Sequence, residues 1–318
     1  MPAIVAKAPA KTILVGEHAV VYNQPAIAFP INQIQAKTTI LANPIGQPDE
    51  INFLAQDIFL NTKYIELPED HPFKVAVDII KKEARIYHYP ACTVRINSEI
   101  PIAAGLGSSA AISVSLLKGL SLFIGLKLNN QQIADLAYQI EIKYHGTPSG
   151  IDNTVIAFNQ PIYFIKNKGF HIINPKENLT LVIANSGVTG NTKEAVAGVK
   201  IRWQQHQDQY NELFSKIGQI VTKAENAIIS GDLNYLGCLL TENHKILMEI
   251  GVSHPILDTM VKVAISSGAL GAKLCGSGLG GNMIALTSPD LAEKIASQLK
   301  NAGAVQTIIE TVQKGKNE

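Results

Sequence analysis

Short runs of apolar residues, separated by turn residues, dominate the first hundred positions and predict strands. Gln33–Leu41 alternates between apolar and polar side chains, as a strand with one exposed face does. Gly16–His18 and Asn23–Pro25 are turn sequences that interrupt the pattern. The opening third of the chain is therefore expected to be largely β, with strands at 4–7, 12–15, 20–22, 26–29, 33–41 and 92–97 and two short strands within 51–60.

Apolar residues at helical spacing become frequent after that. Residues 110–124 are apolar almost all round, which predicts a buried helix. In the helix expected at 131–144, Glu141 falls at the border of the buried face, and a short helix is expected to begin at Ser149. The other expected helices cover 72–85, 192–210, 213–229, 233–249, 255–267 and 291–300, and the other strands cover 161–165, 170–173, 179–184, 271–275, 282–286 and 304–311.

This mixture of strands and helices predicts an α+β fold. At 318 residues the chain is long enough for two domains, and 46% hydrophobic residues with 17% charged ones describe a globular protein with an ample core. Charge and Pro/Asn content peak across Asn174–Asn178. We therefore expect the domains to be residues 1–176 and 177–318.

Net charge and cysteine content indicate which partners and which cellular compartment are expected. A net charge of +1 argues against nucleic acid or an anionic membrane as the main partner. No apolar run is long enough to cross a bilayer, and the N-terminal residues lack the pattern of a signal peptide. Three widely spaced cysteines without a CxxC pair are typical of a reducing compartment. A cytoplasmic location is expected.

Pro101–Ala111 is a loop of small residues between an expected strand and the buried helix. The first N–H groups of a helix lack partners within it and carry the positive end of its dipole, so this segment is suited to bind phosphate. An ordinary capped turn is the alternative. A dinucleotide fingerprint is disfavoured because no acidic residue lies between Ala111 and Ala134, and the chain lacks the Gly-Lys-Ser/Thr of a P-loop.

Polar side chains gather at three other turns. Lys11, Glu17 and His18 lie around a glycine turn between apolar strands, and solvated charges are the simpler reading. Asp152 follows a loop of small residues, where it could be a helix cap or a shielded base. Gly276–Gly281 precedes a strand, so it indicates either a tight β-connection or close backbone approach to a ligand.

Three of these segments together resemble the signature motifs of the GHMP small-molecule kinases. They are Lys11–Pro25, Pro101–Ala111 and Lys273–Leu286. The resemblance implies two domains, the first ribosomal-S5-domain-2-like and the second ferredoxin-like, with the active site in the cleft between them. Within that superfamily, Gly16–Val21, the segment from His145 to Asn153 and the segment from Asn243 to Asp258 are similar to the mevalonate kinase family rather than to galactokinases.

The resemblance also implies residue roles. Asp152 would be the general base, with Lys11 beside it to lower its pKa. Ser109 and Glu141 would hold Mg²⁺. The residues expected to bind ATP are Pro101, Ala104, Gly105, Leu106, Gly107, Ser108, Ser109 and Ala110. Those expected at the acceptor substrate are Glu17, His18, Lys193, Arg202 and Gly278, and the third motif would brace the phosphate loop by backbone approach.

The activity that the resemblance implies is ATP-dependent phosphorylation of the 5-hydroxyl of mevalonate, with ATP and Mg²⁺ as cofactors and no nucleic-acid or membrane partner. It leaves a homodimer open. The alternatives are a GHMP kinase acting on phosphomevalonate, homoserine or a sugar, and a silent sensor that binds ATP without transfer. Two departures from the family pattern bear on substrate preference, namely Leu279 in place of a frequent glycine and Tyr22 in place of a frequent histidine.

Overall fold

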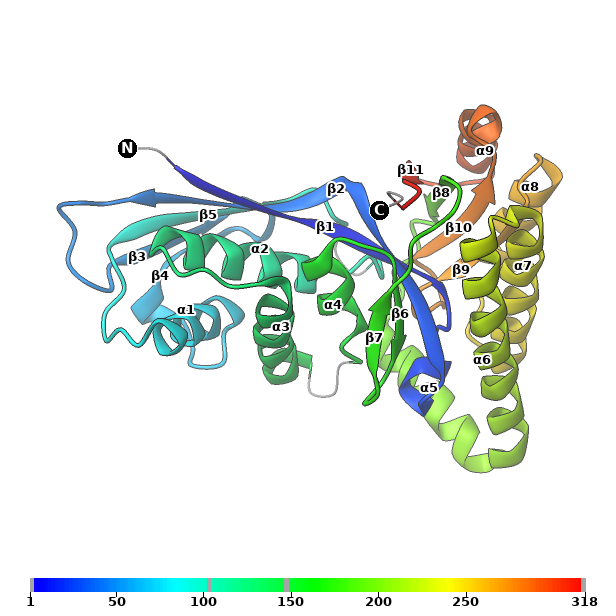
Figure 1. Ribbon diagram of the computed structural model, residues 1–318, viewed down its shortest axis with the longest axis horizontal. Coiled ribbons are helices and arrows are strands. Elements are labelled where there is room, and N and C mark those ends of the chain that lie inside the picture. The colour runs from blue at the N-terminus through cyan, green and yellow to red at the C-terminus, as the bar shows by residue number, and fades with distance from the viewer. Residues whose placement is uncertain (1–2, 102–103, 146–148, 316–318) are drawn as a thin grey trace. The chain divides into compact units, whose positions relative to one another are not determined.

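A computed structural model describes residues 3–101, 104–145 and 149–315, without the side chains of Tyr144 and His145. The predicted break at 145–150 and the tail at 314–318 therefore lie partly outside the described residues. The chain forms two compact units (Figure 1). The first comprises Met1–Ala10, Ile34–Pro101 and Gly107–Asn159, and the second comprises Lys11–Gln33, Ile102–Leu106 and Gln160–Glu318. The chain thus crosses between units several times, whereas the sequence suggested one boundary near residue 176.

In the first unit, four helices lie on the same side of the strands (Figure 1). The C-terminal part of β2 pairs antiparallel with β5, β3 pairs parallel with β5, and β4 forms the edge. The strands are β2 (Pro25–Ala42), β3 (Ile51–Ala55), β4 (Leu60–Lys63) and β5 (Cys92–Ser98), and the helices are α1 (Pro72–Ala84), α2 (Ser108–Phe123), α3 (Asn130–His145) and α4 (Ile151–Phe158).

The nearly all-apolar α2 is the centre of this unit, as the sequence predicted. A Cβ on Gly119 would lie 3.1 Å from the Thr38 methyl carbon, so the glycine lets α2 approach β2 closely. The Thr38 and Ser115 hydroxyls are 3.0 Å apart at the same contact. Helices α1, α3 and α4 all contact α2. The central helix therefore positions the other three helices of this unit.

The second unit is built on a four-stranded antiparallel sheet in the order β11-β8-β10-β9. Helices α7, α8 and α9 contact this sheet, and α6 packs along α7. The N-terminal part of β2 pairs with β6, which continues into β7. The elements are β6 (Ile162–Ile165), β7 (Gly169–Ile172), β8 (Leu179–Asn185), β9 (Gly271–Cys275), β10 (Asn282–Thr287), β11 (Gln306–Val312), α5 (Thr192–Gln205), α6 (Gln207–Ser230), α7 (Leu233–Ile250), α8 (Pro255–Ser266) and α9 (Pro289–Asn301).

Several local predictions for the N-terminal part of the chain and α5 were wrong. The separate strands expected at 26–29 and 33–41 are one strand, β2. Two strands expected around Ala8–Ala10 are one strand, β1 (Ile4–Val15), and its proline is tolerated because β1 pairs only with β2 among the described strands. Ala19–Tyr22 is a 3-10 helix rather than a strand, since left-handed backbone at His18 and Asn23 reverses the chain at both ends. The helix expected to run to Tyr210 ends at Gln205.

Candidate active site

The N-terminus of α2 has the character of an anion site. The helix begins at Ser108, its N-cap is Gly107 with φ 74°, and in the described structure no side chain caps it. The helix start therefore lacks the side-chain cap that a capped turn would have, and phosphate binding there stays a prediction. Uncapped first-turn N–H groups at the positive end of a 16-residue helix favour an anion, and phosphate in particular.

Ser109 and Glu141 meet directly beside this helix end. The Ser109 hydroxyl donates a 2.6 Å hydrogen bond to Glu141 Oε1, joining the first turn of α2 to α3. Glu141 is 7% exposed, so it is buried rather than at the border of the buried face as the periodicity suggested. A buried carboxylate beside a hydroxyl is a pair of hard oxygen ligands, which suits Mg²⁺. The described residues contain no cluster of three or more acidic, His or Cys ligands, and Mg²⁺ bound with ATP needs none because phosphates and water complete its shell.

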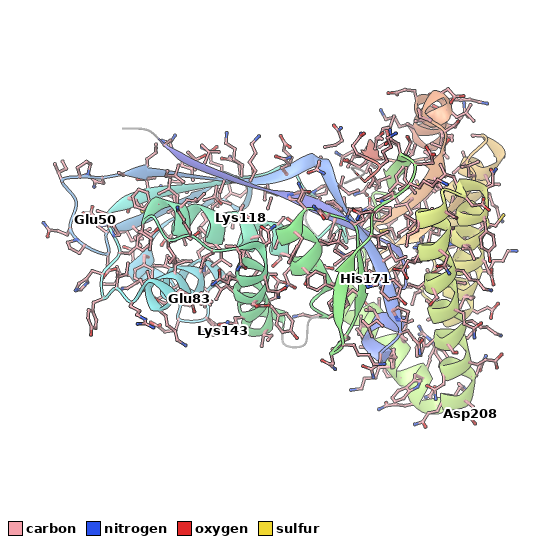
Figure 2. The ribbon with its side chains drawn as sticks, in the orientation of Figure 1. Glu50, Glu83, Lys118, Lys143, His171 and Asp208 are labelled. Atoms are coloured by element: carbon pink, nitrogen blue, oxygen red, sulfur yellow. The ribbon has the colours of Figure 1, made fainter. Side chains whose placement is uncertain are left out.

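Asp152 lies in the first turn of α4, after the N-cap Gly150, and is half-buried. It is therefore not the cap of this helix. Two hydrogen bonds hold α4 in place. Asn153 Nδ2 donates to Ala134 O of α3 at 2.8 Å, and Lys118 Nζ donates to Ala157 O at 3.2 Å. Figure 2 labels Lys118 on α2. Burial lowers the pKa of Lys118. Helices α2, α3 and α4, which carry Ser109, Glu141 and Asp152, are thus tied to one another.

In the second unit, Glu17 and Lys273 form a fully buried ion pair. The Lys273 ammonium contacts Glu17 Oε1 and also donates to Leu274 O at 2.6 Å, and both side chains are at most 1% exposed. Burial raises the pKa of Glu17, while the positive charges of Lys273 and then Lys11 act in the opposite direction. The buried Lys11 is therefore within electrostatic range of Glu17, around the same glycine turn that the sequence indicated.

His18 joins that turn to the glycine loop, defined here as residues 276–281. Its Nε2 donates a 3.0 Å hydrogen bond to Ser277 O, which places the proton on Nε2 and leaves Nδ1 as an acceptor. Burial lowers the pKa of His18 to about 4, so the ring is neutral at pH 7. The Ser277 hydroxyl is 3.2 Å from the hydroxyl of Thr192, the first residue of α5.

The glycine loop also meets the phosphate segment by its backbone. Ala104, Gly105 and Leu106 belong to the second unit, and a Cβ on Gly105 would lie 3.6 Å from Gly276 Cα. Asn282 Nδ2 donates to Ala104 O, and Lys11 N donates to Leu106 O at 3.0 Å. The loop joins the antiparallel strands β9 and β10 and has four glycines at positive φ, which confirms the predicted tight β-connection. Close backbone approach to a ligand stays a prediction.

Leu279 and Gly278 show how tightly the middle of this loop is held. Leu279 has φ 57°, a conformation that costs an ordinary residue about 1–2 kcal/mol and that glycine adopts without this cost. A Cβ on Gly278 would lie 1.9 Å from Val252 O. No other residue fits at position 278 without a backbone shift.

The two cations expected at the acceptor have different settings. Lys193 is exposed in the first turn of α5, whose cap Asn191 accepts from Glu194 N at 3.2 Å. Arg202 donates to Ile250 O at 3.2 Å and to Gly251 O at 3.3 Å, the carbonyls at the end of α7. Arg202 therefore stabilises a helix C-terminus, and its role at a substrate stays a prediction.

Sequence reasoning gave no role to Lys273, although it lies within the third motif. The signal was a single lysine in the otherwise apolar strand Gly271–Cys275, since a buried ammonium needs a counter-charge. Asp152 lies in the first unit and Lys11 in the second, so the expected contact between them stays a prediction.

Two sequence profiles match the chain. The GHMP kinases N terminal domain matches residues 71–160, and the GHMP kinases C terminal domain matches residues 224–305. These matches agree with the two-unit α+β fold and with the uncapped helix end that the second motif provides. The class of protein defined by the fold and the site is the GHMP kinases.

Individual relatives narrow that class. The mevalonate kinase of Pyrococcus furiosus is 35% identical, over 98% of this chain and 97% of its own. The crystal structure of the Methanococcus jannaschii mevalonate kinase superimposes with a TM-score of 0.84 at 26% identity, covering 99% of both chains. That of the L. major mevalonate kinase in complex with R-mevalonate gives 0.83 at 28% identity, covering 100% of this chain and 97% of the other. This chain belongs to the mevalonate kinase family.

Proposed function

We propose that the protein transfers the terminal phosphoryl group of ATP to the 5-hydroxyl of mevalonate, giving 5-phosphomevalonate. The observation that carries the proposal is the Ser109–Glu141 pair at the uncapped end of α2, an arrangement suited to a metal–nucleotide complex. The acceptor is inferred from the relatives, which are mevalonate kinases at 35% identity over nearly the whole chain, one structural neighbour being a complex with R-mevalonate.

Phosphoryl transfer needs positioning and charge stabilisation more than covalent chemistry. The first-turn N–H groups of α2 bind the phosphates of ATP, and the helix dipole favours the charge on them. Ser109 and Glu141 would hold Mg²⁺, which when bound neutralises phosphate charge. Asp152 accepts the proton of the acceptor hydroxyl, and Lys11 is assigned to stabilise the negative charge that develops on the attacking oxygen.

The second unit contributes the acceptor-binding groups in this proposal. His18 is neutral and has its Nε2 bonded to Ser277 O, so its Nδ1 accepts a hydrogen bond from a substrate hydroxyl. The exposed Lys193, at the start of α5, attracts the carboxylate of the substrate. Glu17 acts through Lys273 instead, because a carboxylate that is 1% exposed cannot reach solvent-borne substrate without rearrangement.

A coupled assay of ADP release tests the acceptor. We expect turnover with mevalonate, and a kcat/KM with phosphomevalonate, homoserine and galactose lower by on the order of a hundredfold, because polar groups of the site would be left unpaired. Faster turnover with one of the other alcohols would assign the protein to that substrate. Tight ATP binding without any turnover would favour the silent sensor.

Asp152→Asn tests the base. We expect the affinity for ATP to be unchanged and kcat to fall by about 10²–10⁴-fold, since the amide cannot accept the proton. Asp135→Asn is the matched control, because Asp135 is an exposed carboxylate of α3 that accepts a 2.8 Å hydrogen bond from Gln131 Nε2 on the same helix. Near-normal turnover of Asp152→Asn would remove Asp152 from the mechanism.

A further inference from the structure

His244 of α7 connects two elements of the second unit through its two ring nitrogens. Its Nδ1 accepts from Leu274 N of β9 at 3.3 Å, and its Nε2 lies 3.3 Å from Asp258 Oδ1 of α8. The ring is 5% exposed, and burial lowers its pKa to about 4. A neutral ring with its proton on Nε2 satisfies both contacts at once. No step of the proposed reaction uses this residue.

Asp258 also accepts from the Ser253 hydroxyl. Ser253 lies in the α7–α8 connection, residues 251–254, which is held at its other end by the Arg202 bonds to Ile250 O and Gly251 O. The connection is therefore fixed from α5 on one side and from the His244–Asp258 contact on the other. Short connections with side-chain anchors at both ends have little conformational freedom.

This connection in turn holds the glycine loop. Val252 is fully buried, and its carbonyl accepts from Leu279 N at 2.8 Å. The same carbonyl leaves no space for a side chain at Gly278. Leu274, which donates to His244, lies on the strand that leads into the loop. His244 is thus connected to the loop in two ways. One is direct, through the Leu274 amide of β9, and the other is indirect, through Asp258, Ser253 and Val252.

We propose that His244 and Asp258 are positioning residues that set the geometry of the glycine loop, and through the Ser277 carbonyl the orientation of His18. The acceptor affinity of the kinase then depends on a hydrogen-bonded pair that does not touch the substrate. This inference rests on the proposed function for its kinetic part only, because the position of the loop can also be measured in the protein without substrate.

Thr241 provides a matched control. It lies on the same face of α7, and its hydroxyl accepts from Ala272 N of β9 at 3.4 Å. Thr241→Val therefore removes a side-chain bond from α7 to a β9 amide, as His244→Leu does, but without any contact to Asp258 or to the α7–α8 connection. Asp258→Asn is the conservative variant, since its amide oxygen still accepts from His244 and Ser253.

The experiment measures amide hydrogen exchange without substrate and steady-state kinetics with substrate. Both are measured for the unmodified chain and for four variants, namely His244→Leu, Asp258→Ala, Asp258→Asn and Thr241→Val. We expect His244→Leu and Asp258→Ala to speed exchange of the amides at 276–281 at least tenfold and to raise KM for mevalonate at least tenfold, with kcat within threefold. Thr241→Val should lose thermal stability without either change, and Asp258→Asn should resemble the unmodified chain. If His244→Leu does not fold, Asp258→Ala and Ser253→Ala carry the test.

Equal exchange and equal KM in His244→Leu, Asp258→Ala and Thr241→Val would overturn the proposal and leave His244 as a packing residue. Faster exchange at 276–281 in His244→Leu and Asp258→Ala, together with no turnover of any of the four alcohols by the unmodified chain, would refute the proposed function while keeping the positioning role. The two failures are therefore distinguishable.

Discussion

The charge of a single buried lysine organises the turn that carries His18. Lys273 is wholly inaccessible, and an ion pair in such a place is costly to desolvate. Its value lies in the connection it makes: Glu17 is in the turn after β1, and Lys273 is in β9, next to the residue that bonds His244. The pair fixes one turn to one strand, which positions His18 against Ser277 O.

Breaking this pair should cost more than removing it. We expect Lys273→Met to lower the free energy of unfolding by about 3–5 kcal/mol, because Glu17 is then a buried charge without its counter-ion. The double variant Lys273→Met/Glu17→Gln should recover most of that loss, since no uncompensated charge remains. Denaturant unfolding of the two single variants and the double variant measures the coupling. Additive losses in the double variant would contradict the prediction.

The two buried histidines give stability a defined pH dependence. His18 and His244 have pKa values lowered from 6.5 to about 4, so the unfolded chain binds their protons more readily than the folded one. Their contribution is complete above pH 6.5 and is lost as the pH falls toward 4, on the order of 3 kcal/mol for each ring. Unfolding free energies measured across that window should fall, and His244→Gln should reduce the slope. A pH-independent stability from 6.5 to 4 would contradict this expectation.

At the scale of elements, the short helix α4 carries Asp152, the proposed base. Eight residues are too few for a stable helix in isolation, so its position depends on tertiary contacts. Asn153 of α4 donates to Ala134 O of α3, and Lys118 of α2 donates to Ala157 O of α4. Asp152 is adjacent to Asn153, the first of these anchors.

Asn153→Ala should therefore lower kcat by about tenfold while costing only about 1 kcal/mol of stability, because the lost bond is to a carbonyl that is already within a helix. Thr154→Val is the comparison, since the Thr154 hydroxyl bonds only Gly150 O within the same segment among the contacts described. Steady-state kinetics with thermal unfolding separates the two effects. A kcat loss shared by both variants would show that α4 needs its internal bond rather than its anchor.

Most elements were predictable because their periodicity is strong. The helix at 72–85 and the strand at 92–97 appear as α1 and β5 within one residue of each end. The 3-10 helix at Ala19–Tyr22 was not predictable, since its Val-Val-Tyr sequence favours a strand and only the left-handed backbone at His18 overrides it.

Some features of the candidate site were likewise predictable from local sequence, and others depend on tertiary contacts. The anion site at Pro101–Ala111 follows from local sequence, because a helix N-terminus after small residues has its N–H groups free by construction. The burial of Glu141 does not, since it depends on α2 lying against α3. The ion pair between Lys273 and Glu17 joins residues 256 positions apart, and no local sequence pattern relates residues at that separation.

For the whole molecule, the important feature is that the second unit needs residues from the beginning of the chain. Lys11–Gln33 belongs to it, although a boundary near residue 176 would assign that segment to the other domain. Thr12 Oγ1 is 2.8 Å from Cys275 Sγ, and Glu17 is the counter-ion of Lys273. The described part of the chain has no helix long and apolar enough to cross a membrane.

A fragment of residues 177–318 should consequently fail to fold. Without Lys11–Gln33 its β9 keeps a lysine in an apolar strand with no carboxylate beside it, and this costs several kcal/mol, a large share of the 5–15 kcal/mol that stabilises a typical domain. Circular dichroism and hydrogen exchange of the fragment should show no cooperative unfolding, and co-expression with residues 1–176 should restore a folded complex. Introducing Lys273→Met into the fragment should recover part of the structure, because the uncompensated charge is then absent. A fragment that unfolds cooperatively with Lys273 in place would show that the ion pair is dispensable to this unit, and that the turn at Gly16–His18 is attached to it by other contacts.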